Sequence, residues 1–282
     1  MEPGFDLLSP LNRIRFVAFD TETTGLWAAS NRIVEVGALA FDLEGRDIAM
    51  FTELVNPGRP IPGEVVSIHR ITDSMVSDAD PVGPVLARFF DFCGPDSVLI
   101  AHNAPFDISF IAWEIRRNNL PLPENPIVDT RDLARYLEPD LPSYSLLSLA
   151  LKLELADSQV HRALGDADLV SLIFLKLIGM TREFTTISEL FETIGVYKFA
   201  DGAQVVTELP PEFDSLAAAI RDAATIEIRY AKPGQPIQTR PIRPIHIHRL
   251  GQNLYLNAQC LLAHDERTFR LDRILSWRPL KS

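Results

Sequence analysis

Two apolar runs near the start of the chain constrain its fold most strongly. Residues 15–20 read RFVAFD, and residues 32–41 form a longer run that is rich in Val, Ile and Ala. Short and almost uninterrupted apolar runs of this kind indicate strands that are buried on both faces of a sheet. A third strand is expected over residues 49–55, because the turn-forming residues Asn56-Pro57-Gly58 follow it.

Helices and strands alternate in the next part of the chain. Further strands are expected at residues 97–101 and 127–128. Helical patterns cover residues 84–93, 105–118, 132–137, 145–153 and 163–179. Strands first and strand–helix alternation later predict an α/β domain with a mixed sheet.

The pattern changes after Met180. A helix is expected at residues 188–194, and Pro210-Pro211 then interrupts the chain. After a short helix at residues 215–222, strand patterns follow at residues 225–230, 237–249, 253–261 and 268–274. Strands this short and closely spaced predict a small β-barrel. We therefore divide the chain into a first domain of residues 1–182, a connector of residues 183–212 and a C-terminal domain of residues 213–282.

The charge of the chain is distributed unevenly. The whole chain carries 27 Lys and Arg against 38 Asp and Glu, a net charge of −11, which alone argues against a protein that coats nucleic acid. Residues 210–282, however, contain 11 basic and 7 acidic residues, a net charge of +4, and the remainder carries −15. An acidic body with a basic C-terminal domain is therefore expected.

The remaining composition describes an ordinary globular protein. A hydrophobic content of 46% excludes a mostly disordered chain. Neither a membrane-spanning run nor a signal peptide is recognisable, so no membrane partner is expected. The two cysteines, Cys93 and Cys260, lie far apart, which suits the reducing cytoplasm and argues against a disulfide scaffold.

The strongest chemical pattern lies at the end of the first strand, where residues 19–26 read FDTETTGL. Asp20 and Glu22 are two residues apart on a strand, so their side chains point to one face. Two adjacent carboxylates repel each other unless a cation lies between them, and hard oxygen ligands favour Mg²⁺ or Mn²⁺. An isolated pair of this kind is usually only a surface strand end.

Three further residues extend this pattern. Asp107 is expected in the first turn of a helix, where an acid alone would compensate the helix dipole. His161 precedes the apolar helix over residues 163–179, and Asp166 lies within it. A lone His at a helix entrance is usually a cap, whereas a buried unpaired acid costs several kcal/mol and needs a partner.

Together these motifs resemble the DEDDh (DnaQ-like) 3′–5′ exonucleases, the family of the proofreading epsilon subunit of bacterial DNA polymerase III. The blocks FDTETTGL, HNAPFD at residues 102–107 and HRALGD at residues 161–166 occur in the family's order. Shorter matches are Asn56-Pro57, Ile68-His69, Ile71-Thr72 and Asp129-Thr130. Trp27-Ala28 and Arg70 depart from the pattern and leave the details of substrate contact open. The resemblance implies a ribonuclease-H-like fold, with five strands in mixed order and helices on both faces.

The resemblance also implies roles for these residues. Asp20, Glu22, Asp107 and Asp166 would hold two divalent ions, Mg²⁺ or Mn²⁺, and His161 would act as the general base. The substrate would be single-stranded DNA or RNA with a free 3′ end, DNA being favoured, and the products nucleoside 5′-monophosphates. Expected substrate-binding residues are Thr23 and Thr24 at the 3′-hydroxyl, Leu26 and Phe106 at the bases, and His102 and Asn103 at a phosphate. Ordinary core packing is an equally good interpretation of Leu26 and Phe106.

The C-terminal domain resembles the WYL domain. The matching pieces are residues 216–220, 226–230, 239–244, 254–256 and 267–274, with Leu254 in place of the tryptophan that names the domain. This resemblance implies a small Sm/SH3-like barrel that binds nucleic acid or a nucleotide ligand. The expected binding residues are Arg240, Arg267 and Arg273 beside Tyr230 and Tyr255. A merely solvated barrel surface is the alternative.

The leading hypothesis is therefore a metal-dependent 3′–5′ exonuclease with an appended nucleic-acid-binding or nucleotide-binding domain. One alternative is a ligand-sensing regulatory protein that only binds nucleic acid. Another is a polymerase-associated proofreader. The DNA or RNA preference cannot be read from the residues, since contacts to the 2′-hydroxyl have no sequence pattern.

Overall fold

The computed structural model describes residues 6–44, 49–202, 209–231, 236–250, 253–263 and 265–280. The chain forms two compact units. The first unit consists of Met1–Leu26 and Arg32–Gly202, and the second of Trp27–Asn31 and Ala203–Ser282. Within the described parts of the chain, no helix is both long and apolar enough to cross a membrane.

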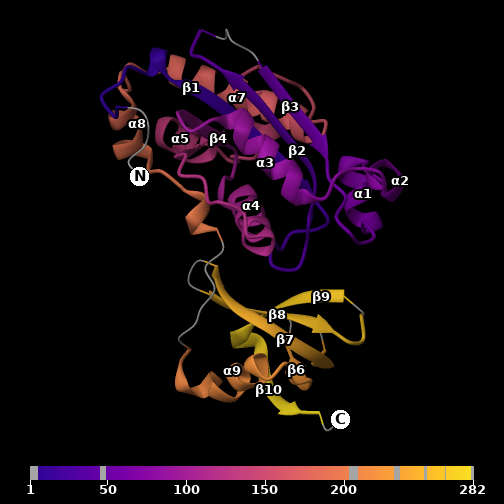
Figure 1. Ribbon diagram of the computed structural model, residues 1–282. Helices are drawn as coiled ribbons and strands as arrows, with labels where there is room; N and C mark the ends of the chain where they lie inside the picture. The colour runs from indigo at the N-terminus through magenta and orange to yellow at the C-terminus, as the bar shows by residue number, and fades with distance from the viewer. Residues whose placement is uncertain are drawn as a thin grey trace. The chain divides into compact units, whose positions relative to one another are not determined.

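A mixed five-stranded sheet forms the centre of the first unit (Figure 1). Its strands are β1 (Arg15–Thr23), β2 (Ile33–Phe41), β3 (Ala49–Leu54), β4 (Ser97–Ala101) and β5 (Ile127–Asp129). They follow the order β3-β2-β1-β4-β5, with β3, β2 and β1 antiparallel and with β4 and β5 parallel to β1. The expected mixed sheet is therefore confirmed.

Eight α-helices of the first unit surround this sheet in the described residues. They are α1 (Gly63–His69), α2 (Asp73–Val76), α3 (Val82–Cys93), α4 (Pro105–Asn118), α5 (Thr130–Leu137), α6 (Leu146–Lys152), α7 (Ala163–Gly179) and α8 (Ile187–Ile194). Short 3₁₀ turns lie at Leu11–Arg13 and Phe199–Asp201. The sequence pattern did not predict α1 and α2, which are short and lie in a segment rich in Pro and Gly.

Aromatic side chains pack on both faces of β1, as a fully buried strand requires. On one face, Phe16 packs against Phe174 of α7, with ring centroids 5.0 Å apart. On the other face, Phe19 packs against Phe89 of α3 at 5.8 Å. These contacts hold the end of β1, which carries the predicted acids, between two layers of helix.

The first unit continues beyond the boundary that the sequence suggested at residue 182. Helix α8 places Ile187 and Leu190 in the same buried cluster as Phe16 and Phe174. A capping box stabilises its start, because the Thr186 side chain accepts from Glu189 N–H while Glu189 accepts from Thr186 N–H. Residues assigned to a connector therefore contribute to the core.

The second unit contains a five-stranded antiparallel sheet. Its elements are α9 (Asp214–Arg221), β6 (Ile226–Tyr230), β7 (Gln238–Leu250), β8 (Asn253–Cys260), β9 (Asp265–Arg270) and β10 (Ile274–Pro279). The order is β10-β6-β7-β8-β9, and no pairing between β9 and β10 closes the sheet in the described residues. A barrel is therefore not established. The single strand expected at residues 268–274 is divided by a 3₁₀ turn at Leu271–Arg273.

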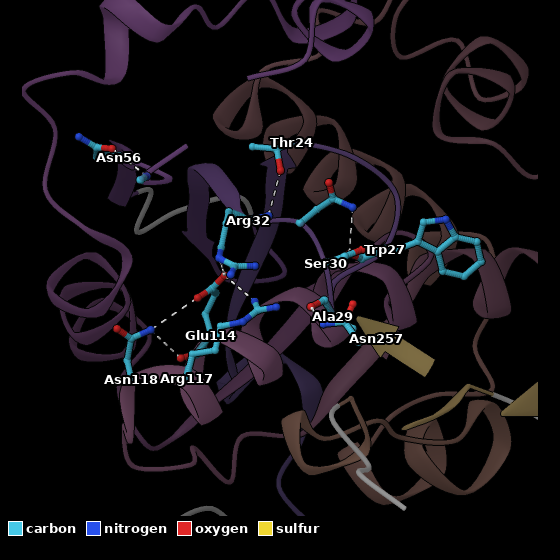
Figure 2. A network of polar contacts seen from close by, with 12 residues as sticks. Thr24, Trp27, Ala29, Ser30, Arg32, Asn56, Glu114, Arg117, Asn118 and Asn257 are labelled. Carbon is cyan, nitrogen blue, oxygen red and sulfur yellow. Dashed lines mark hydrogen bonds and ion pairs between the residues drawn. The ribbon is translucent and has the colours of Figure 1, made fainter. Parts of the chain in front are cut away.

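The second unit also includes the short segment Trp27–Asn31 from the N-terminal half of the chain. Asn257, which is buried on β8, donates its side-chain N–H to the carbonyl of Ala29 at 2.8 Å (Figure 2). Ser30 Oγ lies 2.9 Å from Thr268 Oγ1, and the ring of Trp27 packs against Tyr255. Trp27–Asn31 is therefore a structural part of the second unit.

Candidate active site

Three predicted acids meet at the end of β1. Asp20 and Glu22 project from the strand, and Asp166 comes from the first turn of α7. One carboxylate oxygen from each residue lies within 4.8 Å of those of the other two. Helix α7 crosses the sheet beside β1 and β2, which brings Asp166 to a strand more than a hundred residues away in sequence.

The protonation of these acids reflects their surroundings. Burial, followed by the negative charges of neighbouring acids, raises the pKa of Asp20 well above its usual range. The same two causes raise the pKa of Glu22 to about 8. Burial also raises the pKa of Asp166. A divalent cation would remove the mutual repulsion, and carboxylate oxygens suit Mg²⁺ and Mn²⁺, so these three residues fit a metal site.

Asp107 lies beside this group rather than within it. Its carboxylate Oδ1 accepts from the backbone N–H of Thr21 at 2.9 Å and from the Thr21 hydroxyl at 2.6 Å. Burial raises the pKa of Asp107 to about 7, although the bonds from Thr21 oppose that rise. The charge of Asp107 is also a cause of the raised pKa of Asp20, so the two carboxylates are electrostatically close.

His161 and Gln159 approach the acids from the segment before α7. His161 Nδ1 is 4.0 Å from Asp166 Oδ2, and the imidazole is 45% exposed. Gln159 donates from Nε2 to the same Asp166 oxygen at 2.5 Å. The sequence did not indicate Gln159, because a glutamine outside a motif has no pattern that distinguishes it.

Backbone and side-chain contacts hold the turn after Glu22. Thr24 N–H donates to the carbonyl of Arg32 at 2.8 Å, and Arg32 N–H donates to Thr24 Oγ1 at 3.0 Å. Figure 2 shows this pair and the Arg32 guanidinium beside Glu114 of α4, 3.9 Å away. Thr23 Oγ1 donates to the carbonyl of Gly25 at 2.8 Å. The turn at the end of β1 is therefore tied to the start of β2 and to α4.

The two apolar residues expected at the bases differ in exposure. Leu26 is 76% exposed, so core packing does not explain it. Phe106 is half-buried and packs against Phe110 of the same helix, with ring centroids 5.0 Å apart. Of these two residues, Leu26 is the more accessible.

The His102 side chain forms hydrogen bonds within the protein. Its Nδ1 lies 2.9 Å from Thr130 Oγ1, and its Nε2 lies 2.9 Å from the carbonyl oxygen of Tyr144. Burial lowers the pKa of His102 to about 4, so the ring is neutral near pH 7. Both ring nitrogens already have partners in this structure, and the phosphate contact expected of His102 stays a prediction.

Asn103 belongs to a second polar cluster that the sequence did not reveal. Its side-chain oxygen accepts from Arg131 Nη1 at 2.6 Å. Asp129 accepts from the backbone N–H groups of Asn103, Ala104 and Arg131, each at 2.8–2.9 Å. One carboxylate therefore joins the first turns of α4 and α5.

A cavity of about 530 Å³ opens beside Asp20. Its lining includes Gln159, Asn103, Arg131, Arg135 and the segment of residues 142–146. The buried Nε of Arg131 has no hydrogen-bond partner among the described residues. Two guanidiniums therefore line a cavity that begins at a predicted metal ligand.

The residues expected to bind nucleic acid in the second unit differ in their exposure. Tyr230 is 5% exposed and packs edge-on against Phe269, and Tyr255 is 8% exposed and stacks on His248. Both rings are buried in this structure, and their expected contact with nucleic acid stays a prediction. Arg240 is half-buried and donates to Gln238 Oε1, whereas Arg267 is exposed. Arg273 is half-buried in the turn before β10.

Comparison with known proteins agrees with this geometry. The sequence model of the exonuclease (RNase T) family matches residues 17–174, which contain all of the predicted acids and His161. The chain belongs to this exonuclease family. The model of the WYL domain matches residues 211–279. The chain therefore contains an exonuclease domain, followed by a WYL domain.

Similar proteins include much longer bacterial polymerases. The PolC-type DNA polymerase III of Streptococcus agalactiae is 36% identical over 183 residues, which are 64% of this chain and 12% of that protein. The corresponding protein of Listeria monocytogenes is 37% identical over 172 residues, which are 61% of this chain and 12% of that protein. The chain therefore spans a small part of these relatives.

Solved structures show the same fold in the first unit. The nuclease domain of 3′hExo, a DEDDh family member bound to rAMP, matches with a TM-score of 0.53 at 17% identity and covers 61% of this chain and 95% of that chain. Cell-death related nuclease 4 matches with a TM-score of 0.54 at 16% identity, over 63% of this chain and 67% of that chain. These matches support the ribonuclease-H-like arrangement of strands and helices.

Proposed function

We propose that this protein is a divalent-metal-dependent exonuclease that removes nucleoside 5′-monophosphates from the 3′ end of single-stranded nucleic acid, with DNA favoured. The observation that carries the proposal is the meeting of Asp20, Glu22 and Asp166 within 4.8 Å, with His161 next to Asp166. The same residues occupy the acidic and histidine positions of the family's motifs. Asp107, next to Asp20, completes the proposed set of metal ligands.

The four acids are proposed to bind the metal ions at this site. Two divalent ions, Mg²⁺ or Mn²⁺, would supply positive charge for the attacking and leaving oxygens at phosphorus. Asp20, Glu22, Asp107 and Asp166 would hold these ions, and the raised pKa values mean that protons leave as the ions bind. Without the ions, the acids would repel a phosphodiester.

His161 is the proposed general base. A histidine whose ring is 45% exposed can exchange its proton with solvent and can reach an attacking water. Its backbone is in the left-handed region, with φ of 54°. Asp166, 4.0 Å away, would stabilise the protonated imidazole.

The nucleic acid would lie across the turn after Glu22 and the neighbouring cavity. Thr23 and Thr24 are proposed to contact the 3′-hydroxyl, and Leu26 and Phe106 the terminal base. Arg131 and Arg135 in the cavity would pair with phosphates, and Asn103 is held beside them. Guanidiniums beside an acidic centre give an electrostatic reason for the strand to approach.

The C-terminal domain is proposed to bind the strand or a nucleotide ligand, through arginines rather than through aromatic stacking. Its net charge of +4 over residues 210–282 supports this role. Arg267 is exposed on β9, and Arg240 and Arg273 are half-buried. We further propose that its sheet closes into the small barrel that the WYL resemblance implies.

The test is degradation of matched DNA and RNA single strands that carry a 5′ label. We expect a ladder that shortens from the 3′ end, mononucleotide products, and loss of both on chelation of divalent ions. A 3′-phosphate should block the reaction. Binding of the strands without any metal-dependent cleavage would instead favour the ligand-sensing regulatory protein.

A second candidate function is proofreading in association with a DNA polymerase. The similarity to PolC-type DNA polymerase III supports it, although the match covers 12% of those proteins. A primer with a mismatched 3′ nucleotide should then be degraded faster than a matched primer on the same template. Equal rates on the two primers would exclude selection of mismatches by this chain itself.

A further inference from the structure

Glu35 is an additional buried carboxylate next to the candidate active site. It lies on β2 directly opposite Glu22 of β1 in the sheet register, and it is 1% exposed. Like charges that face each other across antiparallel strands destabilise a sheet. A buried carboxylate at this place therefore requires its own compensating partners.

Those partners come from the segment that begins α7. Arg162 Nε donates to the two carboxylate oxygens of Glu35 at 3.1 and 3.0 Å, and Arg162 Nη2 also donates to Oε1. The backbone N–H of Ala163, the first residue of α7, donates to Glu35 Oε2 at 2.9 Å. Arg162 is the N-cap residue, and its own side chain makes no capping bond. Glu35 therefore supplies from β2 the acceptor that a capping side chain normally supplies.

The same helix start carries the residues proposed for chemistry. His161 immediately precedes Arg162, and Asp166 N–H donates to the carbonyl of Arg162 at 2.9 Å. Gly37, which shares a face of β2 with Glu35, lets the strand approach closely. A Cβ on Gly37 would lie 2.2 Å from the carbonyl carbon of Ala163. The start of α7 is thus held against β2 at two neighbouring points.

We propose that Glu35 and Arg162 are a positioning pair that fixes the start of α7 and thereby sets where His161 and Asp166 lie relative to Asp20 and Glu22. In this role the pair acts through the helix start, which it holds by the contacts of Glu35 with Arg162 and with the Ala163 N–H. This inference rests on the proposed function for its effect on turnover. Its effect on divalent-cation binding does not require that activity, and the charge-keeping variant described below separates the position of the helix start from the direct charge of Glu35 on the acids.

The test compares Glu35→Gln with the wild type. Glutamine keeps the volume and an oxygen for the Ala163 N–H, but it removes the charge that balances Arg162. We expect Mn²⁺ affinity, measured by calorimetry on the metal-free protein, to fall about 10- to 100-fold. The kcat on a single-stranded oligonucleotide should fall by a similar factor, while KM stays within about threefold.

Arg162→Lys keeps the positive charge but loses the bidentate contact with Glu35. Its Mn²⁺ affinity should therefore also fall, by a smaller factor than in Glu35→Gln. Its side chain is 39% exposed, so this variant is expected to fold even if Glu35→Gln does not. The matched control is Glu53→Gln on the neighbouring strand β3. It breaks the surface ion pair between Glu53 and Arg88 of α3. It should leave Mn²⁺ affinity and kcat unchanged.

The outcomes separate this inference from the proposed function. Folded Glu35→Gln and Arg162→Lys proteins with Mn²⁺ affinity and kcat within about twofold of wild type would overturn the positioning role. An equal loss in Glu53→Gln would overturn it too, because the effect would then belong to the sheet in general. If the wild type degrades no nucleic acid, the proposed function fails, and the Mn²⁺ titrations alone decide the positioning role.

Discussion

At the scale of single residues, burial raises the pKa values of the acids in the candidate active site more than their mutual repulsion does. Burial is the largest cause of the raised pKa values of Asp20, Glu22 and Asp166, and neighbouring charges add to it at Asp20 and Glu22. A metal-free site therefore holds protons near neutral pH, and cations must compete with them. Metal affinity and protonation are consequently coupled in this protein.

Removal of a single acid should abolish activity without unfolding the protein. In Asp20→Ala or Asp166→Asn, a ligand for the ions is lost, while repulsion within the acidic group decreases. We expect undetectable turnover and a thermal midpoint, measured without metal, that is equal to or above that of the wild type. Clear metal-dependent cleavage by both variants would remove these residues from the proposed metal site.

The stability of the metal-free protein should depend on pH in a direction that the raised pKa values determine. Below about pH 4, these acids are protonated in both the folded and the unfolded chain. As pH rises toward the folded-state pKa of Glu22, about 8, the unfolded chain has lost protons that the folded chain still binds, so each further rise favours unfolding. This contribution to stability is therefore present at low pH and is lost as the pH rises.

We expect the thermal midpoint of the metal-free protein, measured by calorimetry, to show this loss between about pH 5 and about pH 8. The comparison is with Glu22→Gln, which cannot titrate and should show a smaller decrease. Saturating Mg²⁺ should also reduce the decrease. Identical pH profiles for the wild type and Glu22→Gln would mean that the folded protein does not raise the pKa of this carboxyl.

His161 should contribute to the rate and not to binding. Loss of a general base costs about 10² to 10⁴ in turnover, and His161 is not among the proposed metal ligands. His161→Ala should therefore bind single strands and Mn²⁺ like the wild type while kcat falls by that factor. His102→Ala is an informative comparison, because that ring packs between Thr130 and Tyr144 and its loss should lower stability. Turnover of His161→Ala within about twofold of wild type would exclude its role as the base.

At the scale of helices and strands, the sequence predicted most of the first unit. The runs at β1 and β2 are apolar enough to be recognised directly, because both faces of these strands are covered by helices. The sequence pattern did not predict the short helices α1 and α2. In this region Ile71 and Val76 pack in one buried cluster with Val34, a contact that local sequence does not show. Likewise, Glu35 sits within an apolar run, and nothing in the local pattern shows that it faces the start of α7.

The close approach of β2 and α7 should make Gly37 intolerant of any side chain. A Cβ there would meet Ala163 backbone atoms at 2.2 Å, so Gly37→Ala should lower the unfolding free energy by about 3 kcal/mol, the upper end for overpacking. Gly83→Ala in α3 is the matched control, since its nearest neighbour would be Asn118 Oδ1 at 3.5 Å. It should be neutral or stabilise by about 0.5 kcal/mol. Urea denaturation measures the unfolding free energy of both variants. Equal values for Gly37→Ala and Gly83→Ala would show that β2 and α7 can move apart without loss of stability.

At the scale of the whole molecule, the division of the chain follows contacts that no local pattern contains. The sequence placed the second domain entirely after residue 212, yet the second unit includes Trp27–Asn31. The bond between Asn257 and Ala29 joins residues 228 positions apart. Alternation along a strand likewise does not show which tyrosines the core will use. Tyr230, for example, accepts from the backbone N–H of Arg270 inside the second unit.

The uneven charge of the chain should appear in how binding depends on salt. Each phosphate contact to a single strand that is lost should flatten the log–log dependence of affinity on salt by about 0.7. Replacing Arg240, Arg267 and Arg273 together by Ala should therefore weaken binding of a long strand and reduce this slope by up to about 2. Cleavage of a dinucleotide, which has a single phosphodiester, should be nearly unaffected. The same three positions changed to Lys keep their charge and should keep the slope, which separates electrostatic attraction from loss of shape. Equal losses on long and short substrates would instead indicate a damaged fold, and an unchanged slope would exclude these arginines from strand binding.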